Sequence, residues 1–446
     1  MTQPLAAIVL AAGLGTRMRS ERPKHLHPLL GRRVVDWALD PALTLEPERI
    51  VVVSSPATRE ELEASLPQGV DVVVQAEPRG TGDAVAAARP ALEGFTGDVL
   101  VLDGAAPLLT AAVLSGLRDE QERSGAAVTV LSIEPPELLP YGRVLRDEEG
   151  NLRAIVEERD ASPEELGVRE LNTSIYLFSA DDLWPALASL ESDNTQGELY
   201  LTDAVGTIVA DGKRGAVYRA PDPIVGLGIN NRAELAQAAS ELRDRLLEQH
   251  MLAGVTILDP ATTWIEEPVE IERDAVIHPF TVLRGQTIVR SGAEVGPHAV
   301  VVDAEIGPEA TVGPFAYLRP GTVLGAGAKA GAFVEIKNSS IGDRTKVPHL
   351  SYIGDAEIGE DTNIAAGAIT ANYRPELPDG GKHRTKIGRN VHTGSDNVFV
   401  APVEIGDDAW IGAGSTITED VPAGALAIAR ARQVNKEGRD GNSDDH

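Results

Sequence analysis

The chain has 446 residues, more than one hydrophobic core usually supports, so its length predicts two or more domains. Its composition, 42% hydrophobic and 24% charged, is that of an ordinary globular protein. No apolar run approaches the roughly eighteen residues that span a bilayer, so we expect no membrane insertion. The 68 acidic residues outnumber the 40 basic ones, and the net charge of −28 repels nucleic acid. A phosphate-bearing substrate must therefore meet a few local cations or a metal ion.

The start of the chain and its cysteine count bear on the compartment. The first residues have no basic segment ahead of the apolar stretch, which runs into a glycine loop instead of a cleavage site. We therefore expect no secretory signal and a cytoplasmic protein. The absence of cysteine excludes disulfides, thiolate metal sites and cysteine catalysis.

Residues 1–230 alternate short apolar runs with polar helical stretches. The runs at 6–13, 49–55 and 98–104 are typical of buried parallel strands, and residues 58–66 are typical of a helix between them. This alternation predicts a Rossmann-like α/β domain with a mostly parallel sheet. Residues 231–252 contain no Gly or Pro and predict one connector helix, with apolar side chains at helical spacing. These are Leu235, Ala239, Leu242, Leu246 and Leu247.

Beyond the connector, residues 253–438 have an apolar period of six. The first series runs from Ile271 to Val301 in steps of six, and after a one-residue slip a second runs from Ile306 to Ile336. Helices repeat every 3.6 residues and strands every two, so this period predicts a parallel β-helix of hexapeptide repeats. A chance series in an Ile/Val-rich sandwich is the weaker alternative. Residues 370–386 interrupt the pattern and should loop out, and residues 439–446 predict a disordered tail.

The segment 10–24, LAAGLGTRMRSERPK, ends an apolar strand in a glycine turn and then presents Arg17 and Lys24. Glycines let the backbone approach a phosphate, whose charge a guanidinium and an ammonium can meet. The segment is neither a Walker A loop nor Gly-x-Gly-x-x-Gly. A glycine turn alone is more often plain strand-to-helix geometry, but with both cations at this spacing the pattern is specific.

Six further segments follow in a recognisable order: 74–85, 141–144, 155–161, 170–176, 194–203 and 228–232. With the glycine loop they resemble the sugar-1-phosphate nucleotidyltransferases. The whole of residues 5–438 resembles the GlmU family, in which an N-acetylglucosamine-1-phosphate uridylyltransferase is fused to a glucosamine-1-phosphate N-acetyltransferase. The resemblance implies left-handed coiling of the β-helix, a homotrimer and small-molecule substrates: glucosamine-1-phosphate, N-acetylglucosamine-1-phosphate, UTP and acetyl-CoA.

The resemblance also implies roles for residues of the first domain. Arg17 and Lys24 would be catalytic, neutralising charge with Mg²⁺ as pyrophosphate leaves, and Asn230 would ligate the metal. UTP and the UDP-sugar would be bound by Leu10, Ala11, Ala12, Gly13, Gln75, Gly80, Thr81, Gly142, Glu157, Asn172 and Asn230.

One position departs from the family. Ala105 stands where the resemblance leads us to expect the other metal ligand, an aspartate, and a methyl group cannot coordinate Mg²⁺. Asp103 would sit about 6–7 Å further back in an extended strand, so we do not expect it to substitute. The sequence therefore predicts impaired uridylyl transfer, which Ala105→Asp should raise about a hundredfold.

Segments 317–321, 333–359, 362–373, 394–397 and 425–438 resemble the acetyltransferase half of the same family. His349 stands in the motif that carries the general base, whereas His278 and His298 are expected to be surface residues. By resemblance, the sugar phosphate would be bound by Arg319, Lys337, Tyr352 and Asn363, with a less secure role for Lys382. Acetyl-CoA would be bound by Ala366, Asn372, Tyr373, Ser395, Ala413 and Arg430.

Three alternatives stay open at this point. The β-helix could be structural or regulatory, leaving a nucleotidyltransferase alone. The first site could be dead, leaving an acetyltransferase. Both sites could have decayed, leaving an assembly or regulatory protein.

Overall fold

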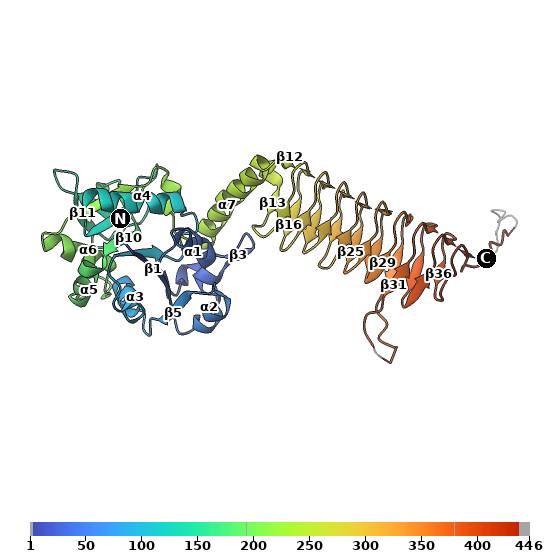
Figure 1. The fold of residues 1–446 in the computed structure, drawn as a ribbon, viewed down its shortest axis with the longest axis horizontal. Helices are drawn as coiled ribbons and strands as arrows, with labels where there is room; N and C mark the ends of the chain where they lie inside the picture. The colour runs from blue at the N-terminus through green and yellow to red at the C-terminus, as the bar shows by residue number, and fades with distance from the viewer. Residues whose placement is uncertain (1–2, 193, 379, 437–446) are drawn as a thin grey trace, which may run out of the picture. The chain divides into compact units, whose positions relative to one another are not determined.

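A computed structural model describes residues 3–192, 194–378 and 380–436. It divides into two compact units, Met1–Leu242 and Arg243–His446 (Figure 1). The tail predicted at 439–446 lies outside the described residues. Within these ranges no helix is both long and apolar enough to cross a membrane.

The first unit is built on one mostly parallel sheet, as predicted. Its strand order is β11-β7-β10-β6-β1-β4-β5, with β10 antiparallel to both neighbours and β8 and β9 added beside β10. A separate two-stranded sheet pairs β2 with β3. The strands are β1 (Leu5–Ala11), β2 (Pro28–Leu29), β3 (Arg32–Arg33), β4 (Arg49–Ser54), β5 (Val70–Val74), β6 (Asp98–Asp103), β7 (Val128–Ile133), β8 (Arg143–Arg146), β9 (Leu152–Val156), β10 (Leu171–Ser179) and β11 (Gly215–Arg219).

Helices and short 3-10 turns connect these strands; α7 follows the last of them, and η6 lies in the second unit. The helices are α1 (Val34–Thr44), α2 (Arg59–Ser65), α3 (Thr81–Ala87), α4 (Ala111–Ser124), α5 (Ala180–Ala188), α6 (Leu201–Ala210) and α7 (Arg232–Leu252). The 3-10 turns are η1 (Thr16–Met18), η2 (Lys24–Leu26), η3 (Arg89–Leu92), η4 (Glu165–Gly167), η5 (Pro223–Gly226) and η6 (Pro260–Thr262).

The sheet has a separate hydrophobic core on each face. Successive side chains of a strand point to opposite faces, so Ala6 and Ile8 of β1 pack into one core while Ala7 and Val9 pack into the other. The first core also contains residues of α3, α5 and α6, and the second contains residues of α1, α2 and α4. A strand buried on both faces is apolar throughout, which explains the continuous run at the start of the chain.

The second unit is a parallel β-helix, confirming the interpretation of the six-residue period. Its coils stack side by side (Figure 1) and form three long sheets, β12-β15-β18-β21-β24-β27, β13-β16-β19-β22-β25-β28-β30-β33-β36 and β14-β17-β20-β23-β26-β29-β31-β34, with β32-β35-β37 as a shorter one. Val295, Val312, Ala330 and Val347 pair in register along one sheet, and all are buried. One shaft of such side chains forms the core.

The strands of this unit are two to four residues long. They are β12 (Thr256–Ile257), β13 (Trp264–Ile265), β14 (Glu270–Ile271), β15 (Val276–Ile277), β16 (Val282–Arg284), β17 (Ile288–Val289), β18 (Glu294–Val295), β19 (Val300–Val302), β20 (Glu305–Ile306), β21 (Thr311–Val312), β22 (Tyr317–Leu318), β23 (Val323–Leu324), β24 (Lys329–Ala332), β25 (Glu335–Lys337), β26 (Ser340–Ile341), β27 (Lys346–His349), β28 (Tyr352–Gly354), β29 (Ala356–Ile358), β30 (Ile369–Ala371), β31 (Thr385–Ile387), β32 (His392–Thr393), β33 (Val398–Val400), β34 (Val403–Ile405), β35 (Trp410–Ile411), β36 (Thr416–Ile417) and β37 (Leu426–Ala427).

The predicted interruption is shorter than residues 370–386. The first two of those residues still belong to β30 and the last two to β31, so the excursion covers the segment between these strands. Figure 1 shows it projecting from the coils next to β31. Because the strands on either side stay paired, with Ile358 opposite Ile387, the loop leaves the shaft intact.

Candidate active sites

The glycine loop after β1 brings a lysine and an arginine to the carboxyl end of the sheet. Leu10 and Ala11 close the strand, and Ala12 and Gly13 begin the loop that leads to η1 and η2. Gly15 has φ of 61°, and a Cβ there would lie 2.7 Å from Cβ of Lys24. Glycine is therefore required for the loop to fold back against Lys24.

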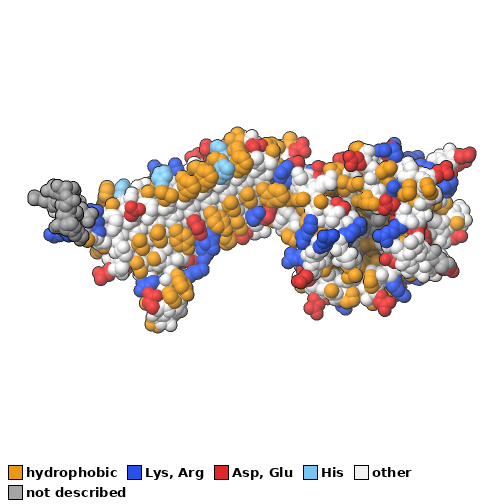
Figure 2. All heavy atoms as spheres, turned by 180° about the vertical axis from the view of Figure 1, so that it is seen from behind, with side chains coloured by type: hydrophobic (Ala, Val, Ile, Leu, Met, Phe, Trp, Pro, Cys, Tyr) orange, Lys and Arg blue, Asp and Glu red, His pale blue; other side chains and the backbone are white. Residues whose placement is uncertain are grey.

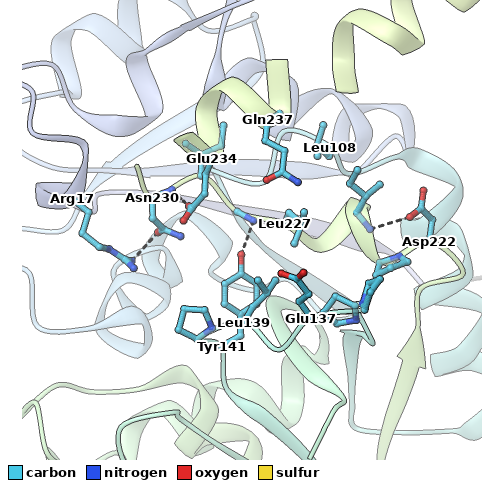
Figure 3. A pocket seen from close by; sticks show the side chains of 18 residues that line it. Arg17, Leu108, Glu137, Leu139, Tyr141, Asp222, Leu227, Asn230, Glu234 and Gln237 are labelled. Carbon is cyan, nitrogen blue, oxygen red and sulfur yellow. Dashed lines mark hydrogen bonds between the residues drawn. The ribbon is translucent and has the colours of Figure 1, made fainter. Parts of the chain in front are cut away.

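Arg17 meets a residue from the far end of the first unit. Its Nη2 donates a hydrogen bond of 2.9 Å to Oδ1 of Asn230. Beside them, the backbone N–H of Gly228 donates to the hydroxyl of Tyr141 at 3.2 Å. These four residues line a cavity of about 540 Å³ (Figure 3). Two residues that the sequence predicted to act together are thus in direct contact.

Asp103 lies in the same region, and the reason given for dismissing it is wrong. The chain does not continue as an extended strand to position 105, because β6 ends at Asp103 and Ala106 N–H closes a turn onto its carbonyl at 3.0 Å. The Asp103 carboxylate instead accepts a hydrogen bond of 2.9 Å from the backbone N–H of Ala105. It also lies 3.8 Å from Nζ of Lys24.

His25 is a buried neighbour of this carboxylate that the sequence analysis did not single out. Its ring is 2% exposed, neither ring nitrogen has a hydrogen-bond partner, and Nε2 lies 4.0 Å from Oδ1 of Asp103. Burial, with the charge of Lys24 adding to it, lowers the pKa of His25 to about 3. The imidazole is therefore neutral at physiological pH.

The residues predicted to recognise the base surround the start of α3. The side-chain amide of Gln75 donates to the carbonyl of Gly80 at 3.0 Å and to Asp83 at 2.9 Å. Gly80 has φ of 115°, and a Cβ there would collide with the carbonyl of Leu199 at 2.4 Å. The hydroxyl of Thr81 accepts a hydrogen bond from the N–H of Leu201 at 3.0 Å. The three predicted residues therefore form one rigid corner.

Gly142, Glu157 and Asn172 form a second group, directly before β8, directly after β9 and within β10. The N–H of Asn172 donates to the carbonyl of Gly142 at 2.8 Å, and a Cβ on Gly142 would lie 3.5 Å from Oε2 of Glu157. Burial raises the pKa of the Glu157 carboxyl, while a hydrogen bond from Thr202 opposes the shift. A small residue at 142 leaves this carboxylate accessible.

In the second unit, four predicted residues gather on the long sheet that contains β22, β25, β28 and β30. Arg319 follows β22 and donates to Glu335 at 2.8 Å. Lys337 ends β25, and a hydrogen bond between the two ammonium groups, with the charge of Lys337 adding to it, lowers the pKa of Lys382, which is contributed by the excluded loop. Tyr352 accepts a long hydrogen bond of 3.5 Å from Asn372. Lys337 and Lys382 give the cluster two neighbouring cations, which suits a phosphate.

A buried carboxylate that the sequence analysis did not consider organises this cluster. Asp355 is 5% exposed and accepts hydrogen bonds from the side chains of Asn338, at 2.5 Å, and Asn372. Its charge raises the pKa of Lys382, against the effect of Lys337. The sequence offered one signal for it, the position of Asp355 within the resemblance segment 333–359.

His349 starts a separate column that runs from coil to coil. Its carbonyl accepts from the N–H of Gly367 at 3.4 Å, and its side chain is exposed. On the following coils, the carbonyl of Ala366 accepts from Asp396 N–H and that of Ser395 accepts from Gly414 N–H, both at 2.8 Å.

The last coils continue this column. Ala413 packs against the coil that carries Ser395, because a Cβ on Gly394 would lie 2.3 Å from its nitrogen. Cδ of Arg430 lies 3.9 Å from where a Cβ on Gly414 would be. The predicted acetyl-CoA residues on these coils thus form one stripe leading away from the predicted base.

The two remaining predicted residues of this unit, Asn363 and Tyr373, form isolated backbone bridges with neighbouring segments. Asn363 bridges Lys346 of the previous coil and His392 of the next. Tyr373 pairs with Lys382 across the base of the excluded loop.

Comparison with known proteins assigns the chain to a family. The MobA-like NTP transferase domain matches residues 7–203, and the bacterial transferase hexapeptide (six repeats) matches residues 384–419. The bifunctional protein GlmU of Streptomyces avermitilis is 48% identical over 98% of this chain and 94% of its own length. The chain belongs to the GlmU family. The GlmU proteins of Brevibacillus brevis, which is 45% identical over 96% of both chains, and Corynebacterium glutamicum, which is 45% identical over 97% and 93%, agree.

Membership of the GlmU family confirms the prediction of a bifunctional transferase, with a nucleotidyltransferase unit followed by a hexapeptide acyltransferase unit. It argues against the alternatives in which the β-helix is only a spacer or the chain is not an enzyme. The roles of the individual residues stay predictions.

Proposed function

We propose that the chain makes UDP-N-acetylglucosamine in two steps. The second unit transfers the acetyl group of acetyl-CoA to glucosamine-1-phosphate, and the first unit then transfers the uridylyl group of UTP to N-acetylglucosamine-1-phosphate. The observation that supports this proposal is that each unit carries a pair of cationic side chains, Arg17 and Lys24 on the loop after β1 and Lys337 beside Lys382 in the β-helix. Both sugar substrates carry a phosphate group, which such cations can bind.

In the first unit, a phosphate oxygen of the sugar attacks the α-phosphorus of UTP, and the bond from that phosphorus to the bridging oxygen of pyrophosphate breaks. Arg17 and Lys24 lie at the carboxyl end of the sheet, where they can neutralise charge on the triphosphate and the leaving group. Gln75 and Gly80 would hold the base of UTP. The hydrogen bond from the Gln75 side-chain amide to the Gly80 carbonyl fixes the two residues relative to each other. Glu157 and Asn172 would hold the sugar.

The residues at the carboxyl end of this sheet fit Mg²⁺. The described residues contain no cluster of three or more His, Cys, Asp or Glu side chains that could hold a metal. Asn230 offers an amide oxygen, and substrate phosphates could supply further oxygen ligands of the kind that Mg²⁺ takes. The orphaned ring nitrogens of buried His25 mark a place where a polar group is needed. Bound there, Mg²⁺ would supply charge neutralisation on the phosphates.

In the second unit, His349 would take a proton from the amino group of glucosamine-1-phosphate. The amine nitrogen then attacks the thioester carbon, the C–S bond breaks, and coenzyme A leaves as the thiol after protonation. Arg319, Lys337 and Lys382 would hold the sugar phosphate, and the stripe from Ala366 to Arg430 would hold acetyl-CoA. The base at the head of that stripe is where the two substrates would meet.

The assembly we propose is a homotrimer held by the second unit, in the cytoplasm, where UTP and acetyl-CoA are available. Phe280, His298, Phe315 and Phe333 stack along one corner of successive coils, with ring centroids 4.6 to 5.0 Å apart. Hydrophobic side chains are exposed along the coils of this unit (Figure 2), and the three phenylalanines are 47% to 57% exposed. An exposed apolar ladder of this kind favours burial against another copy.

The experiment that tests the function follows the two half-reactions separately on the purified chain. Acetyl transfer from acetyl-CoA to glucosamine-1-phosphate and pyrophosphate release from UTP with N-acetylglucosamine-1-phosphate should both occur. Acetyl transfer without pyrophosphate release would support the alternative of a dead first site, for which buried Ala105 is the specific argument.

A further inference from the structure

The carboxylate of Asp103 lies at the end of β6, and most of its hydrogen-bond acceptor sites are unused. In the described part of the chain its only hydrogen bond comes from the N–H of Ala105. The side chain is 28% exposed, whereas Ala105 is fully buried. A carboxylate has about four lone-pair sites, so three remain available to a ligand.

The segment that carries Asn230 runs directly beside this carboxylate. Ile229 N–H donates to the carbonyl of Ala105 at 2.8 Å. A Cβ on Gly228 would lie 3.5 Å from Oδ2 of Asp103. Gly228, two residues before Asn230, therefore lies next to the carboxylate without a side chain of its own to cover it.

Lys24 forms an ion pair with Asp103, and neither Lys24 nor His25 donates a hydrogen bond to this carboxylate. Nζ of Lys24 at 3.8 Å is beyond hydrogen-bond distance. Nε2 of His25, 2% exposed and without a hydrogen bond, is at 4.0 Å. A buried polar atom without a partner is costly, so this arrangement points to a ligand that brings polar atoms of its own.

We propose that Asp103, and not position 105, supplies the carboxylate that binds Mg²⁺ with Asn230 in this chain. The inference rests on the proposed uridylyl transfer. Mg²⁺ needs only one or two carboxylates when substrate phosphates complete its coordination, and the turn after β6 holds the Asp103 carboxylate against the backbone of residue 105 and next to Gly228. The competing interpretation makes Asp103 only a positioning residue for Lys24.

Metal binding measured apart from catalysis tests the proposal. Mn²⁺ is titrated into the full-length chain with UTP, and free Mn²⁺ is followed by electron paramagnetic resonance. Asp103→Asn should weaken Mn²⁺ binding at least about tenfold, the lower end of the loss when even an indirect metal partner is removed. Asp98→Asn, which removes a carboxylate from the other end of β6, should bind Mn²⁺ like the parent chain. Asp103→Glu should recover most of the affinity.

Unchanged Mn²⁺ affinity in Asp103→Asn would overturn the proposal in favour of the positioning role. Ala105→Asp provides a second test. If Asp103 already binds the metal, this substitution should not raise pyrophosphate release about a hundredfold. Such a rise would also overturn the proposal. If the parent chain binds UTP with Mn²⁺ yet releases no pyrophosphate, the proposed function fails while the metal assignment can still hold.

A measurement on the unsubstituted chain covers the case in which Asp103→Asn does not fold. Fe²⁺ replaces Mg²⁺ in the complex with UTP, and ascorbate with peroxide cuts the backbone next to the ion. Cuts at residues 103–105 and 228–230 are expected. Cuts that miss residues 103–105 would overturn the proposal.

Discussion

Arg17 and Asn230 are joined by a 2.9 Å hydrogen bond across 213 residues of sequence. The bond brings the first loop of the sheet and the segment before α7 to one side of the same cavity. Because the guanidinium is a fixed fork of donors, it can hold the amide of Asn230 with one arm and face a phosphate with the rest. The cavity proposed as the first active site is therefore lined by residues from the two ends of its unit.

His349→Ala should abolish acetyl transfer while leaving binding of glucosamine-1-phosphate intact. Losing a general base costs roughly 10²–10⁴ in rate, whereas phosphate binding would depend on Arg319 and Lys337 in the proposed site. Steady-state rates and a calorimetric titration of the sugar phosphate check both parts. Near-native acetylation by the variant would remove His349 from the role, and pyrophosphate release in the same preparation serves as the folding control.

Phe315→Glu should weaken the trimer in the full-length chain. A charge in the aromatic ladder would be buried at the proposed interface, and Phe315 stacks on both His298 and Phe333. Leu138→Glu is the control, because Leu138 is also 47% exposed but lies in the first unit. Sedimentation should show dissociation only for Phe315→Glu. A fragment starting near residue 252 should stay trimeric and keep acetyl transfer, and a stable monomer would contradict the assembly.

Glu157→Gln should raise the melting temperature of the first unit at pH 8 more than at pH 4. Burial raises the folded-state pKa of Glu157, so the ionised carboxylate destabilises the fold. That penalty is absent below the unfolded pKa and grows as the pH rises through the folded pKa. The amide avoids it and can keep the hydrogen bond from Thr202. Calorimetric scans at both pH values check the difference; an equal effect at both would contradict the cause. Uridylyl transfer should fall, since Glu157 would contact the sugar.

Binding of glucosamine-1-phosphate at alkaline pH should take up protons. In the free chain Lys337 lowers the pKa of Lys382, while Asp355 and Tyr352 oppose the shift. A phosphate dianion beside both lysines would favour the charged form, so the pKa of Lys382 would rise on binding. Titration calorimetry in two buffers of different ionisation enthalpy measures the uptake. Lys382→Met should lose it, and proton release by the parent chain would contradict the arrangement.

The sequence predicts the β-helix well because its signal is local. Each coil places an apolar residue every six positions, and pairs such as Val295 with Val312 follow from that spacing. The approach of Arg17 to Asn230 could not be derived from spacing, since no local rule joins residues so far apart. The prediction that these two residues act together came from the order of the motifs that the chain shares with the GlmU family.

Asp103 shows where the local argument fails. The run VLVLDG predicts a strand but not where it ends, and the strand ends at Asp103 in a turn in which the Asp103 carboxylate accepts a hydrogen bond from the backbone of residue 105. His25 and Asp355 were missed for a related reason: their importance lies in burial and in neighbours, which only the fold supplies.

The most direct test of the central claim is to supply one purified chain with glucosamine-1-phosphate, acetyl-CoA, UTP and Mg²⁺ and to follow the products by mass spectrometry. UDP-N-acetylglucosamine should form only when all are present, and leaving out UTP should stop the reaction at N-acetylglucosamine-1-phosphate. Failure to form either product from the complete mixture, or formation of the nucleotide sugar without acetyl-CoA, would contradict a chain with two consecutive transferase sites.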